Sequence, residues 1–325
     1  MTSITEAARA APPARRVSAL RRYVGVGLAL TILIAVLAAT QPHFATYANM
    51  MNILRTNSVL FVTAVGLTFV IVSQGLDLSI GSMVALGGVF LAVMLAAGIP
   101  APFAVILTIL ICSVLGAAVN GGLIAYGGFN FFVVTLAMMQ LLRGAALVFS
   151  NGLPLSTIDH PLIQFLGDGF LYGVPVPVII AILVGLVGDV VMRWTRFGRS
   201  VYAVGGNETA ARLAGIDVRR VRFAVYTISP FTAGIGAVML TGRLTSSQPV
   251  SGAAGLELSA AAAVLLGGAS FAGGAGNIAG TAVGVVFLGV LANGIVLAGV
   301  PSYWQGIATG FVLVAAIALD RLRSR

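Results

Sequence analysis

Three charged side chains lie inside or beside long apolar stretches of the sequence, namely Asp77, Glu257 and Arg143. A charge at the centre of a membrane span costs about 2.5–3.5 kcal/mol on insertion scales, so such residues usually serve a transport pathway or a polar network. Asp77 and Glu257 each precede a serine by two residues, Ser79 and Ser259. This pattern predicts that each carboxylate bonds to free amides or caps the next helix through that serine. Direct contact with a transported solute is the alternative.

Arg143 follows Gln140 within the apolar stretch at 131–149. Its position indicates that it lines a pathway or pairs with a carboxylate such as Asp77. The alternative is that its long side chain extends along apolar surface to bring the guanidinium to a membrane interface.

The sequence segments that contain Asp77 and Glu257 are similar to each other. The segment "GLDLSIGSMVALGGVFLA" at 75–92 aligns without a gap with "GLELSAAAAVLLGGASFA" at 255–272, and nine of the 18 positions are identical. A weaker echo pairs "NGGLIA" from position 120 with "NGIVLA" from position 293. The sequence therefore contains an internal duplication.

The composition places these residues in a membrane. Hydrophobic residues make up 59% of the chain, charged residues 8%, and the mean hydropathy is +1.06, which is too apolar for the surface of a soluble protein. A span needs about 17–25 apolar residues. We expect an all-α polytopic membrane protein with ten spans, near 23–40, 57–74, 82–98, 102–121, 131–149, 174–192, 223–241, 257–272, 278–298 and 302–319.

With this count, five spans separate the two copies of the repeat. An odd number of spans makes the copies point in opposite directions across the bilayer, which is the inverted-topology repeat of many transporters. The sequence thus predicts two inverted halves of about five spans each.

Fifteen of the 18 basic residues lie in three clusters, which explains the net charge of +9 without nucleic acid. Five arginines precede the first apolar run, seven lie in 193–222 and three end the chain. By the positive-inside rule, both termini and the 193–222 loop are predicted to be cytoplasmic. We expect a cytoplasmic arm at 1–22 and one membrane domain at 23–325. A cleaved signal sequence at the first apolar run is the alternative.

Several chemical functions are not indicated. The single cysteine, Cys112, cannot form an intrachain disulfide or a CxxC metal site. His43 and His160 lie beside proline in predicted connections. The glycine-rich stretch at 266–277 lacks the GK[ST] end of a phosphate loop. We therefore expect no catalytic residue, no metal site and no cofactor bound by this chain.

The cytoplasmic loop contains a short helix signal. Asn207 is a suitable N-cap, Gly215 is a suitable terminator, and Glu208 and Arg212 are four residues apart. The predicted helix runs through Ala214, and its small apolar face consists of Ala210, Leu213 and Ala214. A two-turn helix is marginal alone, so it is interpreted as a docking element for a partner's groove. A solvated connector is the alternative.

Glycine pairs spaced four apart occur in "GTAVG" at 280–284 and "GIATG" at 306–310. Small residues at this spacing lie on one helical face and favour close helix packing. We expect both pairs to pack against neighbouring helices.

Four segments resemble the permease subunit of bacterial ribose-type ABC importers. They are "GLDLSIGS", "GGNETAARLAGI", "SSQPVSGAAGLELSAAAAVLLGGASFAGGAGNIAGT" and "PSYWQGI". The resemblance implies a homodimeric or pseudo-dimeric membrane core, cytoplasmic ABC ATPases that bind ATP-Mg, and an extracytoplasmic sugar-binding protein. It also implies an ATPase-coupling loop around Gly206, Asn207, Ala210, Ala211, Leu213 and Gly215. The commoner importer consensus has Glu-Ala-Ala before its glycine, where this chain reads "ETAARLAG".

The leading hypothesis is thus a permease subunit in the bacterial cytoplasmic (inner) membrane. It would form the path for a monosaccharide or related small polar solute, with a second permease copy or paralogue, while a partner hydrolyses ATP. An ion-coupled secondary transporter is the alternative, with Asp77, Glu257 or Arg143 as coupling residues. A passive channel is a third class. The sequence does not name the sugar.

Overall fold

The computed structural model describes residues 15–156, 160–250, 253–301 and 303–323. Most of the arm predicted at 1–22 lies outside these residues. The described part is a helical bundle with one short hairpin, β1 (Phe170–Leu171) and β2 (Val174–Pro175). The all-α prediction is confirmed.

Ten apolar helices coincide with the ten predicted segments. Six are long and apolar enough to cross a membrane by length and composition, and the other four have shorter apolar parts of 10–17 residues. The six are α2 (Tyr47–Val72), α4 (Ala101–Gly116) with its π-helical continuation η1 (Ala117–Tyr126), α5 (Phe131–Phe149), α7 (Val176–Trp194), α10 (Val218–Leu244) and α12 (Ile278–Leu297). The four are α1 (Arg15–Thr40), α3 (Ile80–Ala96), α11 (Leu256–Leu266) and α13 (Trp304–Arg323).

Three further helices lie in the connections. They are α6 (Pro161–Asp168), α8 (Arg196–Gly206) and α9 (Glu208–Leu213). The last two lie in the predicted 193–222 loop, and α6 was not predicted. A proline at its first position and the His160 side chain, which accepts a hydrogen bond from the Leu162 N–H at 3.2 Å, start α6.

The predicted span at 257–272 is wrong in its second half, because α11 ends at Leu266. An 11-residue helix is about 16 Å long, roughly half of a bilayer core. The chain turns at Gly268, whose φ of 90° is a left-handed value that suits glycine, and continues irregularly to Asn277. The aligned glycines of the first copy, Gly87 and Gly88, lie inside α3. The two copies thus share sequence and differ in secondary structure.

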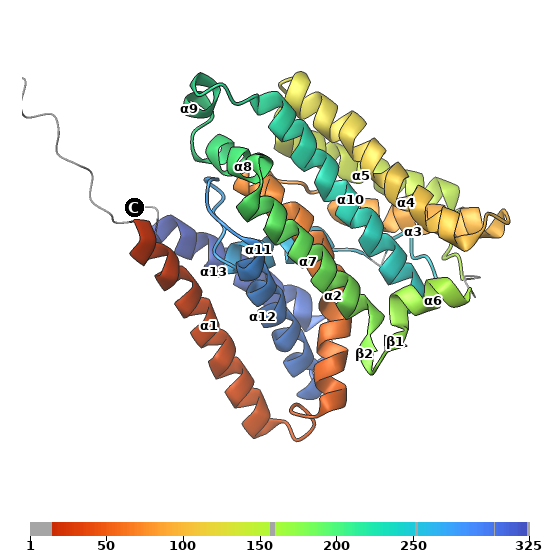
Figure 1. The fold of residues 1–325 in the computed structure, drawn as a ribbon. Coiled ribbons are helices and arrows are strands. Elements are labelled where there is room, and N and C mark those ends of the chain that lie inside the picture. The colour runs from red at the N-terminus through yellow and green to blue at the C-terminus, as the bar shows by residue number, and fades with distance from the viewer. Residues whose placement is uncertain (1–14, 157–159, 251–252, 302, 324–325) are drawn as a thin grey trace, which may run out of the picture.

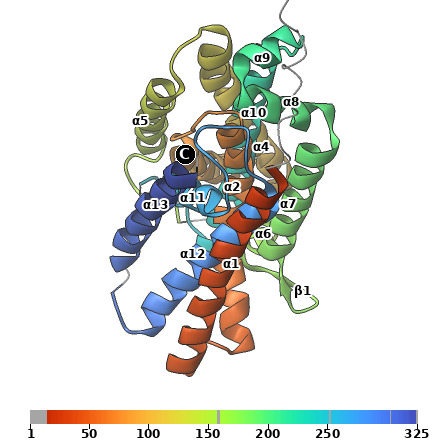
Figure 2. The ribbon, with the colours of Figure 1, turned by 90° about the vertical axis from the view of Figure 1, so that its left-hand side faces the viewer.

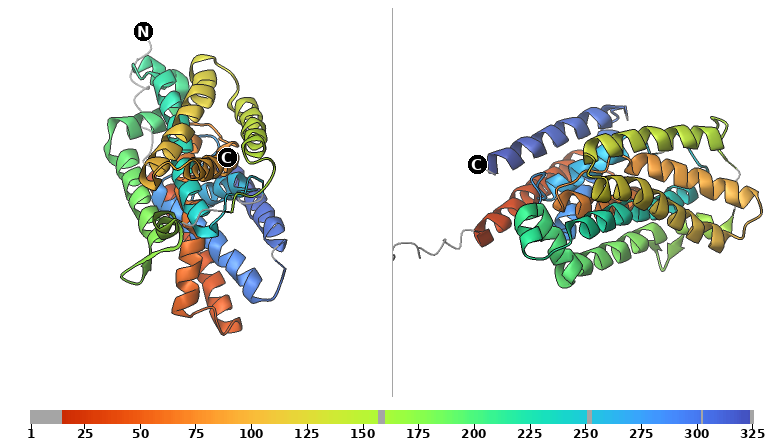
Figure 3. Two further views of the ribbon diagram at one scale, coloured as in Figure 1. Left: turned by 90° about the vertical axis from the view of Figure 1, so that its right-hand side faces the viewer. Right: turned by 90° about the horizontal axis from the view of Figure 1, so that it is seen from above.

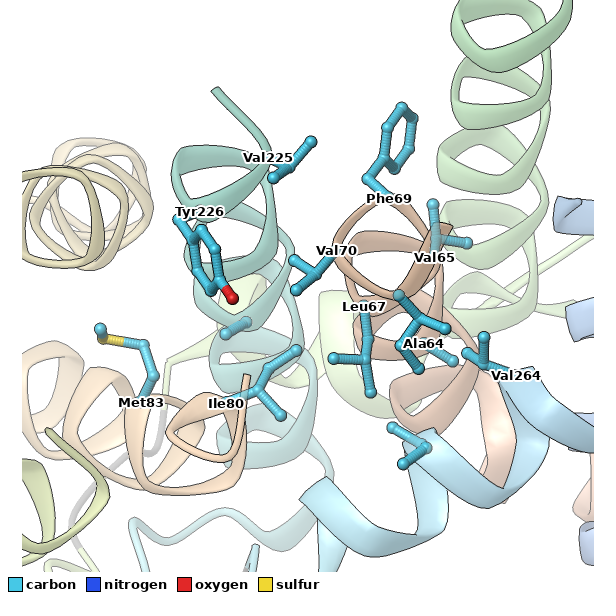
Figure 4. Packing of buried hydrophobic residues seen from close by; sticks show 14 of the residues in the cluster. Ala64, Val65, Leu67, Phe69, Val70, Ile80, Met83, Val225, Tyr226 and Val264 are labelled. Atoms are coloured by element: carbon cyan, nitrogen blue, oxygen red, sulfur yellow. The ribbon is translucent and has the colours of Figure 1, made fainter. Parts of the chain in front are cut away.

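Helix α2 lies at the centre of the bundle and packs against α7, α10, α11 and α12. Figure 4 shows its side chains Leu67 and Val70 beside Tyr226 of α10 and Ile80 of α3. These four side chains are almost completely buried. Every residue of α2 from Val62 to Val72 is buried, so this half of the helix belongs to the core and fixes the position of the loop that follows it.

The ends of the bundle differ in character. Helices α8 and α9 lie at one end, near the C-terminal end of α13, while the β1–β2 hairpin and the α1–α2 connection lie at the other (Figures 1 and 2). Helices α5 and α13 share one face of the bundle, and α7 lies on the opposite face (Figures 2 and 3).

The two predicted glycine pairs behave differently. A Cβ at Gly284 would overlap the carbonyl oxygen of Ala263, so this position is a close helix contact as expected. A Cβ at Gly306 or Gly310 would meet no atom within 4 Å. The expectation of close packing at 306–310 is therefore wrong within the described chain, and these two glycines leave open space.

We expect Gly87→Leu and Gly267→Leu to reduce the amount of folded chain in the membrane. A Cβ at Gly87 would lie 2.8 Å from the Ala237 Cβ, and one at Gly267 would overlap the backbone of Gly280. Backbone cannot move aside as a side chain can, so Gly267→Leu should be the more damaging. The measurement is monodisperse protein recovered in detergent. The Gly27→Leu control, on open space in α1, should be recovered normally. Normal recovery of both test variants would contradict the close-packing interpretation.

Candidate functional site

The loop between α2 and α3 is held by the carboxylate of Asp77. This side chain is 1% exposed and accepts hydrogen bonds from the backbone N–H of Ser79 at 3.0 Å, from the Ser79 hydroxyl at 2.5 Å and from the Ser229 hydroxyl at 2.7 Å. The bond to the N–H two residues on is an Asx turn, which starts α3. The predicted bond of Asp77 to a free amide is confirmed.

This network extends to two other elements, η1 and α10. The Asn120 side chain on η1 donates to the Ser79 hydroxyl at 2.9 Å, and the Tyr226 hydroxyl on α10 donates to the Leu76 carbonyl at 3.3 Å. Sequence reasoning did not single out Ser229 or Tyr226, since neither belongs to a repeat or motif. Asn120 had a signal, as the first residue of the weaker echo. Together these residues fix the α2–α3 loop between α10 and η1.

The second copy is arranged differently. Helix α11 already begins at Leu256, so Glu257 lies in its first turn and Ser259 lies inside the helix. The predicted cap through Ser259 is therefore wrong. The Glu257 carboxylate is 8% exposed and lies directly against Gly81 of α3, where a Cβ would overlap it. Glu257 of the second copy thus contacts the first copy of the repeat at Gly81.

Arg143 is half-buried on α5 and lines a small gap with Ser82 of α3 and Ala253. Among the described residues it forms no ion pair. The suggested pairing with Asp77 is wrong, because serines and the Ser79 amide satisfy that carboxylate. A position on a pathway and extension of the side chain to a membrane interface both remain predictions for Arg143.

The predicted coupling segment forms the helix α9, flanked by caps. The Asn207 side chain accepts a hydrogen bond from the Ala210 N–H at 2.9 Å, and Gly215 has a φ of 80° just after the helix. Both terminal signals are confirmed, although α9 ends at Leu213, one residue before the predicted end. Glu208 bonds to Arg212 at 2.7 Å, as its spacing indicates, and to Arg222 at 2.6 Å.

One residue of α9 points inward and its apolar face points outward. Ala211 is 4% exposed and belongs to the core, whereas Leu213 is 85% exposed. Gly206, Ala210, Ala214 and Gly215 are also exposed. An exposed leucine on a capped helix at the end of the bundle is a surface that a partner can cover.

Helix α8 joins this segment to the membrane core through backbone contacts. A Cβ at Gly205 would overlap the carbonyl oxygen of Val72, the last residue of α2. The same carbonyl accepts a hydrogen bond from the Gly274 N–H at 2.8 Å, and the Tyr202 hydroxyl donates to the Gly276 carbonyl at 2.7 Å. We call the meeting of α8, the end of α2 and the 267–277 loop the glycine junction. It links α8 directly to the end of α2, just before the irregular segment 73–79, and to the 267–277 loop.

A polar cavity of about 380 Å³ opens beside the glycine junction. Its wall includes Gln74, Asn130, Arg222 and Tyr226. Gln74 has a φ of 66°, an unusual value for a non-glycine residue, directly before the Asp77 loop. The cavity thus lies between the 73–79 loop and the start of α10.

Known proteins are similar to this chain over most of its length. The family described as branched-chain amino acid transport system / permease component matches residues 49–317. The ribose import permease protein RbsC of Escherichia coli (strain K12) is 42% identical over 296 residues, covering 90% of this chain and 92% of that protein.

Two other relatives are named for sugars other than ribose. The D-allose transport system permease protein AlsC of Escherichia coli (strain K12) is 35% identical, covering 93% of this chain and 92% of that protein. The L-arabinose ABC transporter permease protein AraH of Azospirillum brasilense is 35% identical, covering 92% of this chain and 87% of that protein. No solved structure matches the chain. With its ten apolar helices and its family match over 49–317, the chain is an integral membrane protein that belongs to the branched-chain amino acid transport system / permease component family and resembles its ribose-type import permeases.

Proposed function

We propose that this chain is the membrane-spanning permease subunit of an ATP-driven importer for a monosaccharide or related small polar solute. The observation that carries the proposal is 42% identity to a ribose import permease over 90% of the chain. The relatives are named for ribose, D-allose and L-arabinose, so the particular sugar does not follow from similarity.

The polar groups of the core favour this proposal over an ion-coupled transporter. A coupling carboxylate must exchange its ion or proton during each cycle, whereas the Asp77 carboxylate is bonded to three donors on two elements. Its arrangement suits a fixed structural role. The exposed Leu213 and the glycine junction provide what an ATPase-driven protein needs, namely a docking surface and a contact from it to the core.

We also propose that all ten apolar helices belong to the membrane domain and form two inverted halves. The support is a set of helix contacts that repeats when α2, α3, α4 and α5 are exchanged with α10, α11, α12 and α13. The α2–α12 contact corresponds to α10–α4, α3–α5 corresponds to α11–α13, and α2–α11 corresponds to α10–α3. Such exchange is expected of the inverted repeats on which alternating access depends.

The remaining partners follow from the same proposal. The chain lies in the cytoplasmic (inner) membrane with both termini and the 193–222 loop in the cytoplasm, and α9 docks on an ABC ATPase that binds ATP-Mg. An extracytoplasmic binding protein delivers the sugar to the other end. A second permease copy or paralogue completes the pathway, and the face that carries α5 and α13 (Figure 3) is open to it. This chain binds no cofactor itself.

The test is uptake by proteoliposomes that contain the chain, its co-encoded ATPase and its co-encoded sugar-binding protein. We expect uptake of radiolabelled ribose, D-allose or L-arabinose only with ATP on the ATPase side. Uptake by the chain alone, driven by a proton or sodium gradient, would favour the ion-coupled alternative. Conductance without either energy source would favour a channel.

The orientation is tested by labelling single cysteines in intact cells with a membrane-impermeant thiol reagent. Arg199→Cys at the α8–α9 end should be protected, and Tyr172→Cys, at a position that is 99% exposed on the hairpin at the opposite end, should react. The native Cys112 is buried, so it should give no background. Reaction at position 199 without cell lysis would overturn the orientation.

A further inference from the structure

A cavity of about 440 Å³ lies between α2, α11, α12 and α13. Its volume is within the range of small-molecule sites, about 300–1,000 Å³. Five polar side chains line it, and among the described residues none of its lining side chains is charged. The polar five are Thr56, Asn57, Ser259, Gln305 and Thr309. The described lining side chains can therefore form hydrogen bonds with a bound molecule but provide no charge to pair with it.

Several of these groups have unused hydrogen-bonding capacity. Within the described chain the hydroxyls of Ser259 and Thr309 make no hydrogen bond. The amide of Asn57 donates to the Ile53 carbonyl at 2.8 Å and that of Gln305 donates to the Ala292 carbonyl at 3.5 Å. Both amide oxygens stay available as acceptors. Hydroxyls and amide oxygens together match the alternating donor and acceptor character of a sugar hydroxyl.

The two open glycines explain why there is space here. Gly306 and Gly310 line the cavity one turn apart on α13, and a Cβ at either would meet no atom within 4 Å. Gly255 lines it too, directly before α11. Glycine at these positions widens the cavity, instead of bringing helices together.

Comparison of the repeat copies distinguishes this site from the Asp77 network. Ser79 is completely buried and bonded to Asp77 and Asn120. Its aligned partner Ser259 is partly exposed and faces the cavity. The same motif thus serves as structure in the first half and presents a free hydroxyl in the second.

We propose that this cavity holds the uncharged, polyhydroxylated solute during its passage, with Ser259, Thr309, Asn57 and Gln305 bonding to its hydroxyls. This inference rests on the proposed import function. A few neutral hydrogen bonds suit a pathway, because a solute must leave the site as readily as it enters. A solute with a net charge would find no counter-charge among the described lining residues.

The experiment uses Ser259→Cys and Thr309→Cys in the complete complex, with the ATPase and the sugar-binding protein, in proteoliposomes. Before modification, each variant should import ribose, D-allose or L-arabinose within about tenfold of wild type, since one neutral hydrogen bond contributes about 0.5–1.5 kcal/mol. A small methanethiosulfonate reagent should then abolish uptake by filling the cavity. The transported sugar should slow the modification.

Two controls make the outcome decisive. Wild type has only the buried Cys112 and should keep its uptake after the reagent. Ser58 follows the cavity residue Asn57 on α2, does not line this cavity and is 2% exposed. The Ser58→Cys variant should therefore also keep its uptake after the reagent. Full uptake by fully modified Ser259→Cys, or no reaction at either test position, would overturn the cavity proposal. Absence of ATP-dependent uptake by unmodified wild type would instead contradict the import function.

Discussion

Leu213→Asp should abolish co-purification of the ATPase and ATP-dependent uptake, while the chain itself still inserts and folds. Leu213 is 85% exposed, so its replacement leaves the core unchanged. If a partner covers this surface, the new carboxylate loses its water without gaining a counter-charge, which costs several kcal/mol. The measurement is the ATPase retained by affinity-purified permease, together with uptake at matched expression.

Two matched variants accompany this prediction. Tyr172→Asp adds the same charge at a 99% exposed position on the opposite end and should retain the ATPase. Asn207→Ala removes the α9 cap and should weaken docking moderately, because losing a cap costs about 0.5–2 kcal/mol of helix stability. If Leu213→Asp keeps full binding and uptake, α9 does not dock through this face.

Asp77→Ala should destabilise the chain and eliminate uptake. The change leaves three buried donors without their acceptor, the Ser79 amide and the hydroxyls of Ser79 and Ser229. A hydroxyl can rotate to another acceptor but the amide cannot, and one buried unsatisfied donor costs about 1–3 kcal/mol. The measurement is the thermal unfolding midpoint of the detergent-solubilised chain, with uptake in parallel.

Asp77→Asn separates this structural role from an ionic one. Its carbonyl oxygen can still accept from the Ser79 amide, and the Ser229 hydroxyl can turn to accept from its amide group. We expect stability and uptake close to wild type. Complete loss of uptake with normal stability in Asp77→Asn would show that the charge itself is required.

Most of the fold was predictable because it depends on local properties of the sequence. Long apolar stretches, as in α7 and α12, mark helices directly. The end of α11 was not predictable from the repeat, because the glycine pair that stops this helix lies inside α3 in the other copy. What differs is the sequence after the pair, Val89–Phe90 in one copy and Ala269–Ser270 with further glycines in the other.

The site was predictable only where its residues interact locally. Asn207, Glu208 and Gly215 act within a few residues, so capping and spacing rules found them. The partners of Asp77 and Glu257 could not be found in this way. Ser229 is 152 positions from Asp77, and Gly81 meets Glu257 only when α3 and α11 are packed together. Such contacts depend on tertiary packing, which local patterns in a single sequence do not reveal.

The glycine junction has a mechanical consequence. Side chains between two elements act as a compliant layer, because they can change rotamer and absorb a small shift. At Gly205 this layer is missing, since its Cα approaches the carbonyl of Val72 with no room for even a methyl group. Close-packed protein has low compressibility and transmits strain. A displacement of α8 of a few tenths of an ångström must therefore be followed by the end of α2 and the 267–277 loop together, or the junction must separate.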